Sequence, residues 1–201
     1  MNLIANNCCG AYWYKYNDLQ FNNPFVWMVL DYPYMLNLAM QYKNIDFTKI
    51  KLFQGNLDQH DYYGININEN INIEYVHYRY KENVENIQKE GVELFSKNIH
   101  KFTVDKFFNR TARMLKLNED PTFLIMDYKD HYYTENTQHF IDQVKYDTII
   151  FTNNNYKINR DNVQLILTKE QSITHRRIQP EDFIKTYNND INNAIKILSY
   201  K

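Results

Sequence analysis

The stretch TFLIMDYKDHYYTENTQHFIDQVKYDTIIF, residues 122–151, contains two short apolar runs on either side of a helical segment. The runs Thr122–Met126 and Asp147–Phe151 are rich in β-branched and aromatic residues, which is typical of strands. The segment between them, Thr134–Val144, is predicted to be a helix. Because strands and helices that alternate in this way are typical of a parallel sheet, the stretch predicts an α/β fold.

The sequence on the C-terminal side continues this pattern. Val163–Leu167 is predicted to be a further strand, and Pro180 to start a last helix. Apolar residues recur at helical spacing in that helix, namely Ile184, Tyr187, Ile191, Ile195 and Leu198. These elements predict three layers, with helices on both sides of a mostly parallel sheet.

The N-terminal residues are predicted to form a strand that leads directly into a helix. Leu3-Ile4-Ala5 is a short apolar run, Asn6-Asn7 are good helix caps, and residues 11–16 are consistent with a helix start. The cysteines Cys8 and Cys9 are therefore expected at a strand-to-helix junction, near the helix N-terminus.

The middle of the chain is predicted to mix strands and helices. The expected strands are Lys49–Gln54 and Ile71–Tyr80, and Phe25–Leu30 is expected to be a buried strand or a turn of helix. The expected helices run from Asp31 to about Gln41, from Asn83 to Asn98 and from Thr103 to Leu117. The sequence contains no repeat, Gly/Ser linker or charge block, so one domain of residues 1–201 is predicted. The alternative division is two intertwined α/β lobes, about residues 1–100 and 101–201.

The composition limits the classes of partner. The 23 Lys+Arg and 24 Asp+Glu give a net charge of -1, which argues against nucleic acid as the main partner. The longest apolar segment, Phe25–Met40, is interrupted by Asp31, Pro33 and Asn37, so no membrane span is expected. The 28 Asn and 18 Tyr are typical of AT-rich codons and are discounted as evidence of binding.

The cysteine content and the first residues favour a reducing, cytoplasmic setting. Cys8 and Cys9 are the only cysteines, and adjacent residues do not form a relaxed disulfide. Residues 1–7 lack the basic and apolar regions of a signal peptide. Since no Cys/His pairs repeat at zinc-ligand spacing, neither a metal nor another cofactor is predicted.

Cys8 is the strongest candidate for chemistry. A thiol at a helix N-terminus has a lowered pKa, because the helix dipole and the unpaired N–H groups favour the thiolate. The same N–H groups, aided by Asn7, would stabilise an oxyanion. The alternative interpretation is that both cysteines are packing residues.

A cysteine nucleophile needs a base, which is most often histidine. His77 lies between Val76 and Tyr78 on an expected strand and is the best placed of the six histidines. The alternative is a hydrogen-bonded core histidine.

Three further residues are candidates for binding substrate. Arg110 and Arg113 share one helix face and would form a fork for a phosphate or carboxylate, or else a solvated charged face. Asp127 ends a strand, where α/β proteins often hold ligand groups, although it is equally a turn residue.

Four sequence blocks together resemble known groups: Ile4–Gly10, Phe21–Phe25, Glu74–Tyr78 and Phe108–Arg113. In order and spacing they resemble a bacterial exopolysaccharide-biosynthesis family with an Asn-Asn-Cys-Trp-Gly start and the related papain-like cysteine peptidases. The resemblance covers about residues 2 to 127. The composition also resembles that of proteins from large AT-rich DNA viruses or low-GC bacteria, which implies host cytoplasm or a virion if the source is viral.

The resemblance implies that Cys8 is the nucleophile, His77 its base, and Arg110 and Arg113 the paired arginines of the motif. The leading hypothesis is therefore a thiol-dependent acyl-transfer enzyme, a papain-like hydrolase or acyltransferase, with a small-molecule, glycan or peptide substrate. One alternative is a glycan-biosynthesis protein, such as a glycosyltransferase, that binds a nucleotide-sugar or phosphosugar. A second alternative is a non-enzymatic virion or assembly protein.

Overall fold

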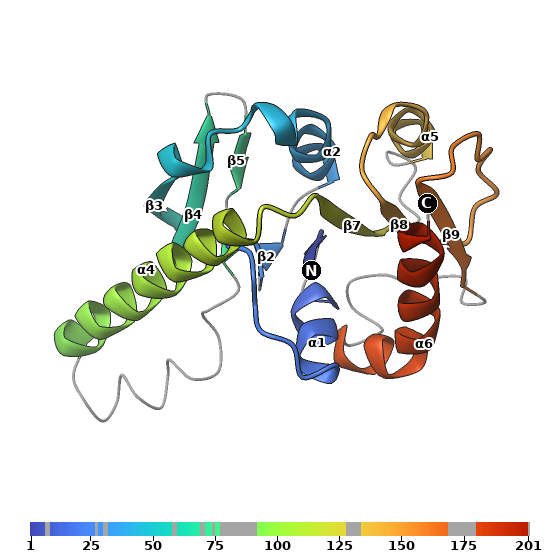
Figure 1. Ribbon diagram of the computed structural model, residues 1–201. Coiled ribbons are helices and arrows are strands. Elements are labelled where there is room, and N and C mark those ends of the chain that lie inside the picture. The colour runs from blue at the N-terminus through green and yellow to red at the C-terminus, as the bar shows by residue number, and fades with distance from the viewer. Residues whose placement is uncertain are drawn as a thin grey trace.

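Four parallel strands form the central sheet of the computed structural model (Figure 1). In spatial order they are β1 (Asn2–Ala5), β7 (Pro121–Met126), β8 (Thr148–Thr152) and β9 (Val163–Leu167). Every residue of β1 and β8 is buried, as expected for a parallel sheet with both faces covered. The predicted parallel sheet is confirmed, and it joins a strand from the start of the chain to three from the second half.

The structure describes residues 1–6, 9–26, 28–29, 32–57, 60–68, 71–73, 75–76, 92–127, 134–168 and 180–200. Within these ranges the helices are α1 (Cys9–Tyr16), α2 (Tyr32–Gln41), α4 (Val92–Leu117), α5 (Thr134–Gln143) and α6 (Pro180–Ser199). Short 3₁₀ turns, η1 (Tyr42–Asn44) and η2 (Phe47–Lys49), follow α2.

The two faces of the sheet are covered by different helices. Alternate strand residues such as Leu3, Leu124 and Ile149 belong to one buried cluster with side chains of α1 and α6. The residues between them, such as Ile4 and Phe123, belong to a second cluster with side chains of α2, α4 and α5. This alternation follows from the two-residue period of a strand. The predicted three-layer α/β arrangement is therefore confirmed.

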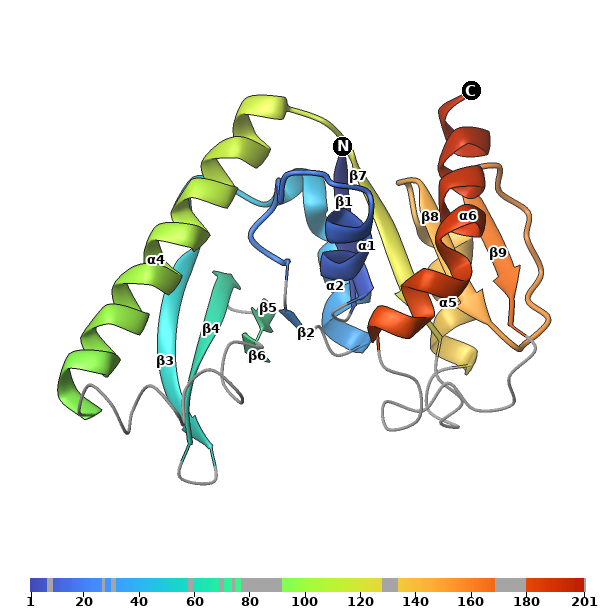
Figure 2. The same ribbon diagram turned by 90° about the horizontal axis from the view of Figure 1, so that it is seen from below.

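Two smaller antiparallel sheets lie outside the central one. One contains β3 (Lys51–Leu57), β4 (His60–Asn68) and β5 (Ile71–Ile73), and the other pairs β2 (Met28–Val29) with β6 (Tyr75–Val76). Figure 2 shows β3, β4 and α4 at one end of the molecule and β9 and α6 at the other. The strand expected over Ile71–Tyr80 is two separate strands within its described residues, because β5 pairs with β4 and β6 pairs with β2.

Two expectations for the middle of the chain are corrected. The helices expected over Asn83–Asn98 and Thr103–Leu117 are one helix from Val92 onward, since no Gly or Pro interrupts residues 92–117; residues 83–91 lie outside the described ranges. The strand β4 was not expected, because its sequence includes Asp61, Gly64 and two asparagines, residue types that are rare in strands.

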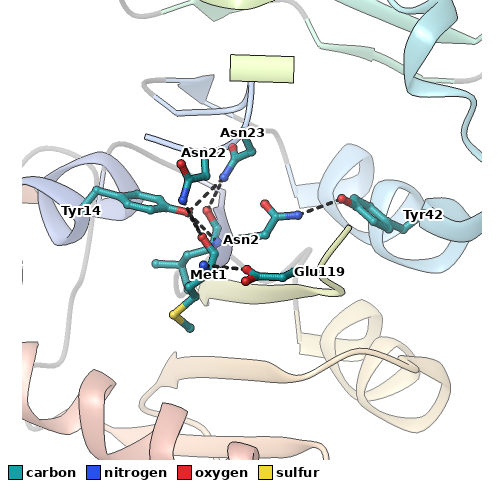
Figure 3. Close-up of polar contacts among 8 residues, drawn as sticks. Met1, Asn2, Tyr14, Asn22, Asn23, Tyr42 and Glu119 are labelled. Atoms are coloured by element: carbon teal, nitrogen blue, oxygen red, sulfur yellow. Dashed lines mark hydrogen bonds and ion pairs between the residues drawn. The ribbon is translucent and has the colours of Figure 1, made fainter. Parts of the chain in front are cut away.

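The free edge of β1 is covered by side chains instead of another strand (Figure 3). The Leu3 N–H donates to the Tyr14 hydroxyl at 2.8 Å, and the Asn23 amide donates to the Leu3 carbonyl at 2.8 Å. The Tyr14 hydroxyl in turn donates to the Met1 carbonyl at 3.1 Å. Burial raises the pKa of Tyr14 to about 12, so its hydroxyl keeps its proton at neutral pH.

The start of β1 is anchored from the opposite side. The Asn2 amide donates to the Tyr42 hydroxyl at 2.9 Å, and the α-ammonium group of Met1 lies 2.6 Å from a Glu119 carboxylate oxygen (Figure 3). The Tyr42 ring also contacts the Phe47 ring in a tilted arrangement and the Tyr146 ring edge to face. The strand is thus fixed along its edge and at its start, which determines where its last residue lies.

Candidate functional site

The junction between β1 and α1 lies at the carboxyl end of the parallel strands. β1 ends at Ala5 and α1 begins at Cys9, two residues earlier than expected, so the predicted change from strand to helix is confirmed. Asn6, the first residue after β1, is 4% exposed. Its side-chain amide donates to the Met126 carbonyl at 3.1 Å and accepts from the Met126 N–H at 3.0 Å. The junction is therefore tied directly to the end of β7.

The first turn of α1 packs closely against the end of β1. A Cβ atom added to Gly10 would lie 2.7 Å from the Cβ of Ala5, a distance that real Cβ atoms do not show. Cys9 is 2% exposed in the layer that α1 forms with α6. Glycine at position 10 is thus required for the helix to begin this close to the strand.

All three predicted catalytic residues lie outside the described residues, namely Cys8, Asn7 and His77. Their neighbours in the chain are described: Asn6 and Cys9 flank the first two, and β6 ends at Val76, directly before His77. Their catalytic roles stay predictions.

Arg110 and Arg113 both hold the segment that follows α1. The Arg110 Nη1 donates to the Val26 carbonyl at 3.0 Å, and its guanidinium lies 5.0 Å from the centre of the Phe21 ring. The Arg113 Nε and Nη2 both donate to the Phe21 carbonyl, at 3.0 and 2.7 Å. Arg110 is 5% exposed, so a solvated charged face is the wrong interpretation for this residue.

The contacts of Arg113 connect two of the sequence blocks that carry the family resemblance, Phe108–Arg113 and Phe21–Phe25. Arg110 and Arg113 hold residues 21–26, and Asn23 within that segment covers the edge of β1. These hydrogen bonds support the fold, and the binding of an anion by the two arginines stays a prediction.

Asp127 ends β7 as expected and lies in a buried polar network. Its carboxylate accepts from the Tyr156 hydroxyl at 2.6 Å and the Thr152 hydroxyl at 2.7 Å. Two longer hydrogen bonds, at 3.2 Å, come from the Asn154 amide and the Thr137 hydroxyl. Burial, together with the hydrogen bond to Asp127, raises the pKa of Tyr156 to about 12. The carboxylate thus joins β7 to β8, α5 and the chain after β8.

Two surface cavities lie among the described residues near this framework. One, of about 210 Å³, lies between α1 and α6 and is lined by Tyr12, Lys15, Tyr16, Glu181 and Ile184. The other, of about 220 Å³, lies near the start of the sheet and is lined in part by Tyr42, Phe47 and Met114. The first cavity borders α1, the helix that begins at Cys9.

Sequence reasoning missed the roles of Asn6 and of the partners of Asp127. Asparagines and tyrosines are discounted above as products of codon bias, although Asn6 makes a specific buried contact and Asn154 and Tyr156 make specific half-buried ones. An amide directly after the last apolar residue of a strand was the signal that could have identified Asn6.

Within the described ranges, no helix is long and apolar enough to cross a membrane, and no group of three or more His, Cys, Asp or Glu could hold a metal ion. No protein-family model matches the chain, and no curated protein matches it in sequence.

Proposed function

We propose that the protein is a thiol-dependent acyl-transfer enzyme in which Cys8 is the nucleophile. The observation that supports this is the junction itself: a parallel strand ends at Ala5 and a helix begins at Cys9, on either side of Cys8 in the chain. Helix N-termini lower the pKa of nearby thiols, and the carboxyl ends of parallel strands are common ligand sites.

In the proposed reaction the Cys8 thiolate attacks the acyl carbon of an ester or amide, and the carbonyl oxygen becomes an oxyanion. His77 takes the thiol proton and gives it to the leaving alcohol or amine as the bond to carbon breaks. Water or an acceptor hydroxyl or amine then attacks the thioester, loses its proton to His77 and releases the thiolate. Main-chain N–H groups after the thiol, with Asn7, hold the oxyanion in both steps.

The substrate is an acyl group on a glycan or a peptide, and its transfer to water or to an acceptor distinguishes a hydrolase from an acyltransferase. The contacts of Arg110, Arg113 and Asp127 are with the protein's own framework. In this proposal they support the site from outside and do not touch the reacting atoms.

The test is the rate of alkylation of each thiol between about pH 5 and 9, a range that includes the value near 8.5 for an ordinary thiol. The variants Cys9→Ser and Cys8→Ser let each cysteine be followed alone by peptide mass spectrometry. Cys8 is expected to react with a midpoint below pH 7 and to lose this reactivity in His77→Ala. Cys9, which is buried, is expected to react slowly throughout.

Turnover of activated acyl esters, followed on the same proteins, completes the test. Cys8→Ala is expected to abolish turnover and to leave the unfolding transition unchanged. Retained turnover in Cys8→Ala, or a Cys8 that titrates like an ordinary thiol, contradicts the proposal.

A further inference from the structure

The cavity of about 220 Å³ lies at the amino ends of the parallel strands, away from the junction of β1 and α1. Its walls come from the last turn of α4, the residues that lead into β7, and the turns η1 and η2 with the chain between them. Residues 42–47 and 114–120, which line it, all belong to the described ranges. Its volume is below the range of about 300–1,000 Å³ that is typical of sites for drug-sized ligands, so it fits a smaller molecule.

The floor of the cavity is apolar and is formed by Tyr42, Phe47 and Met114. The centres of the Tyr42 and Phe47 rings lie 4.9 Å apart, and Phe47 and Met114 are both buried. The Tyr42 hydroxyl accepts from the Asn2 amide at 2.9 Å and donates to the Met114 sulfur at 3.5 Å. Because these contacts already fix the floor, an apolar group can bind on it without the cost of ordering its side chains.

Two charges of opposite sign lie at the rim of the cavity, on Lys43 and Asp120. A third charged residue of the rim, Glu119, is matched by the α-ammonium group of Met1 at 2.6 Å. The Lys43 ammonium group lies 5.8 Å from the centre of the Tyr146 ring, which is a neutral partner. Neither Lys43 nor Asp120 forms an ion pair with another described residue, and both side chains are exposed.

The two charges act on the same aromatic residue, Tyr146. Burial is the main reason why the pKa of Tyr146 is raised, and the negative charge of Asp120 adds to it. Since the Lys43 ammonium group lies over the ring of this tyrosine, both charges are gathered around one side chain. They are too far apart to pair with each other, so each is available to a group of a ligand.

We propose that the cavity binds a small zwitterion with an apolar body, of the chemical class of a free apolar α-amino acid. The ammonium group of the ligand pairs with Asp120 and its carboxylate with Lys43, while its side chain lies on the apolar floor. A ligand with only one charge would leave the other rim charge without a partner, so the zwitterion is favoured. The small volume favours a free amino acid over a peptide. This site is separate from the junction at which acyl transfer is proposed, and it does not depend on Cys8.

The test is an NMR titration of the intact chain with three ligands that share one apolar body. At pH 7, L-phenylalanine carries both charges, 2-phenylethylamine only the positive charge and 3-phenylpropionate only the negative charge. L-phenylalanine is expected to shift the amide signals of residues 42–47 and 114–120 with a Kd of about 1 mM or below. It is expected to bind about tenfold more tightly than either singly charged analogue.

Two variants each remove one charge and keep the size of the side chain. Asp120→Asn is expected to weaken the binding of L-phenylalanine and 2-phenylethylamine by about fivefold or more, and not to weaken that of 3-phenylpropionate. Lys43→Gln is expected to weaken L-phenylalanine and 3-phenylpropionate by a similar factor, and not to weaken 2-phenylethylamine. Since both side chains are exposed, neither variant is expected to disturb folding.

The cavity between α1 and α6 provides the matched control, because it has a similar volume and also has a lysine and a carboxylate in its lining. Its carboxylate, on Glu181, already pairs with Lys185 at 3.2 Å. Lys15→Gln and Glu181→Gln are expected to leave the binding of all three ligands unchanged. If they weaken L-phenylalanine as Lys43→Gln and Asp120→Asn do, the effect is one of general charge and the inference is wrong.

Two other results overturn the inference. One is the absence of a saturable shift at residues 42–47 and 114–120 with L-phenylalanine at about 10 mM. The other is an equal affinity for L-phenylalanine and a singly charged analogue, because the second charge of the ligand would then have no partner at the rim. Losses of affinity that follow the charge removed by each variant support the proposed site.

Discussion

The carboxyl ends of β1 and β7 are paired neighbours, but their polar groups are used in different ways. After β7, the Asp127 carboxylate accepts four hydrogen bonds from neutral donors of the protein. After β1, the Asn6 side chain binds the backbone N–H and carbonyl of Met126 at the end of β7. The comparison indicates that the carboxylate after β7 gathers side chains from several elements, whereas the amide after β1 binds the backbone of the neighbouring strand.

The strongest test of this difference is Asp127→Ala. Four donors lose a buried acceptor, so the free energy of unfolding is expected to fall by about 3–5 kcal/mol. Urea denaturation measures this change, while the alkylation profile of Cys8 in the folded protein is expected to stay the same. The control is Asp142→Ala, an exposed carboxylate bonded to Gln138, with a change below about 0.5 kcal/mol. A loss for Asp127→Ala below about 1 kcal/mol would show that the network contributes little.

The close contact between α1 and β1 gives the second prediction. A glycine-to-alanine change inside a helix ordinarily stabilises it by up to about 1 kcal/mol. At Gly10 the added methyl meets the Ala5 Cβ at 2.7 Å, so a loss of about 1–3 kcal/mol is expected instead. The double variant with Ala5→Gly removes the clash and is expected to recover most of the loss. Stabilisation by Gly10→Ala alone would be inconsistent with the described junction.

Tyr14→Phe tests the covered edge of β1 and has the smallest expected effect at neutral pH. The variant removes the acceptor of the Leu3 N–H and the donor to the Met1 carbonyl, and a loss of about 1–2 kcal/mol is expected. Tyr16→Phe is the matched control, since Tyr16 is 55% exposed. Equal stability of the two variants in thermal unfolding would show that the hydroxyl does not hold the strand.

Tyr14→Phe also tests the covered edge of β1 at high pH. The pKa of Tyr14 is about 12 in the folded protein and 10.0 in the unfolded chain, so the folded state holds its proton more tightly. This stability is complete below pH 10.0 and is lost as pH rises from 10.0 towards about 12. The wild-type protein is therefore expected to lose more stability than Tyr14→Phe over this window. Tyr42 and Tyr156 also have a raised pKa, but they are present in both proteins, so the difference reports Tyr14.

Elements with continuous apolar runs or clear helical stripes could be predicted from the sequence. β7, β8, β9, α5 and α6 all begin and end within a residue or two of their expected positions. β4 could not be predicted from the sequence, because it is a polar strand that is stabilised by pairing with β3 and β5. Local sequence carries little information about such pairing.

The candidate site was predictable only in part, for a related physical reason. The strand-to-helix junction follows from local sequence, since Ala5, Asn6 and Gly10 are close in the chain. The partners of Arg110 and Arg113 are carbonyls 84 and 92 positions away, and a carbonyl group is present at every residue. No pattern of residue types distinguishes such a backbone partner from a bound anion.

The bond between Asn6 and Met126 joins groups that are 120 positions apart in the sequence. Because β1 precedes β7 in the chain, a ribosome makes this strand well before its partner in the sheet. The covering of its other edge by Tyr14 and Asn23 needs only residues within the first two dozen, and these emerge almost together with the strand. Sheet formation itself must wait for β7, and contacts this distant in sequence are typical of slow folding steps. The catalytic junction of our proposal would thus be completed only after β7 has been made.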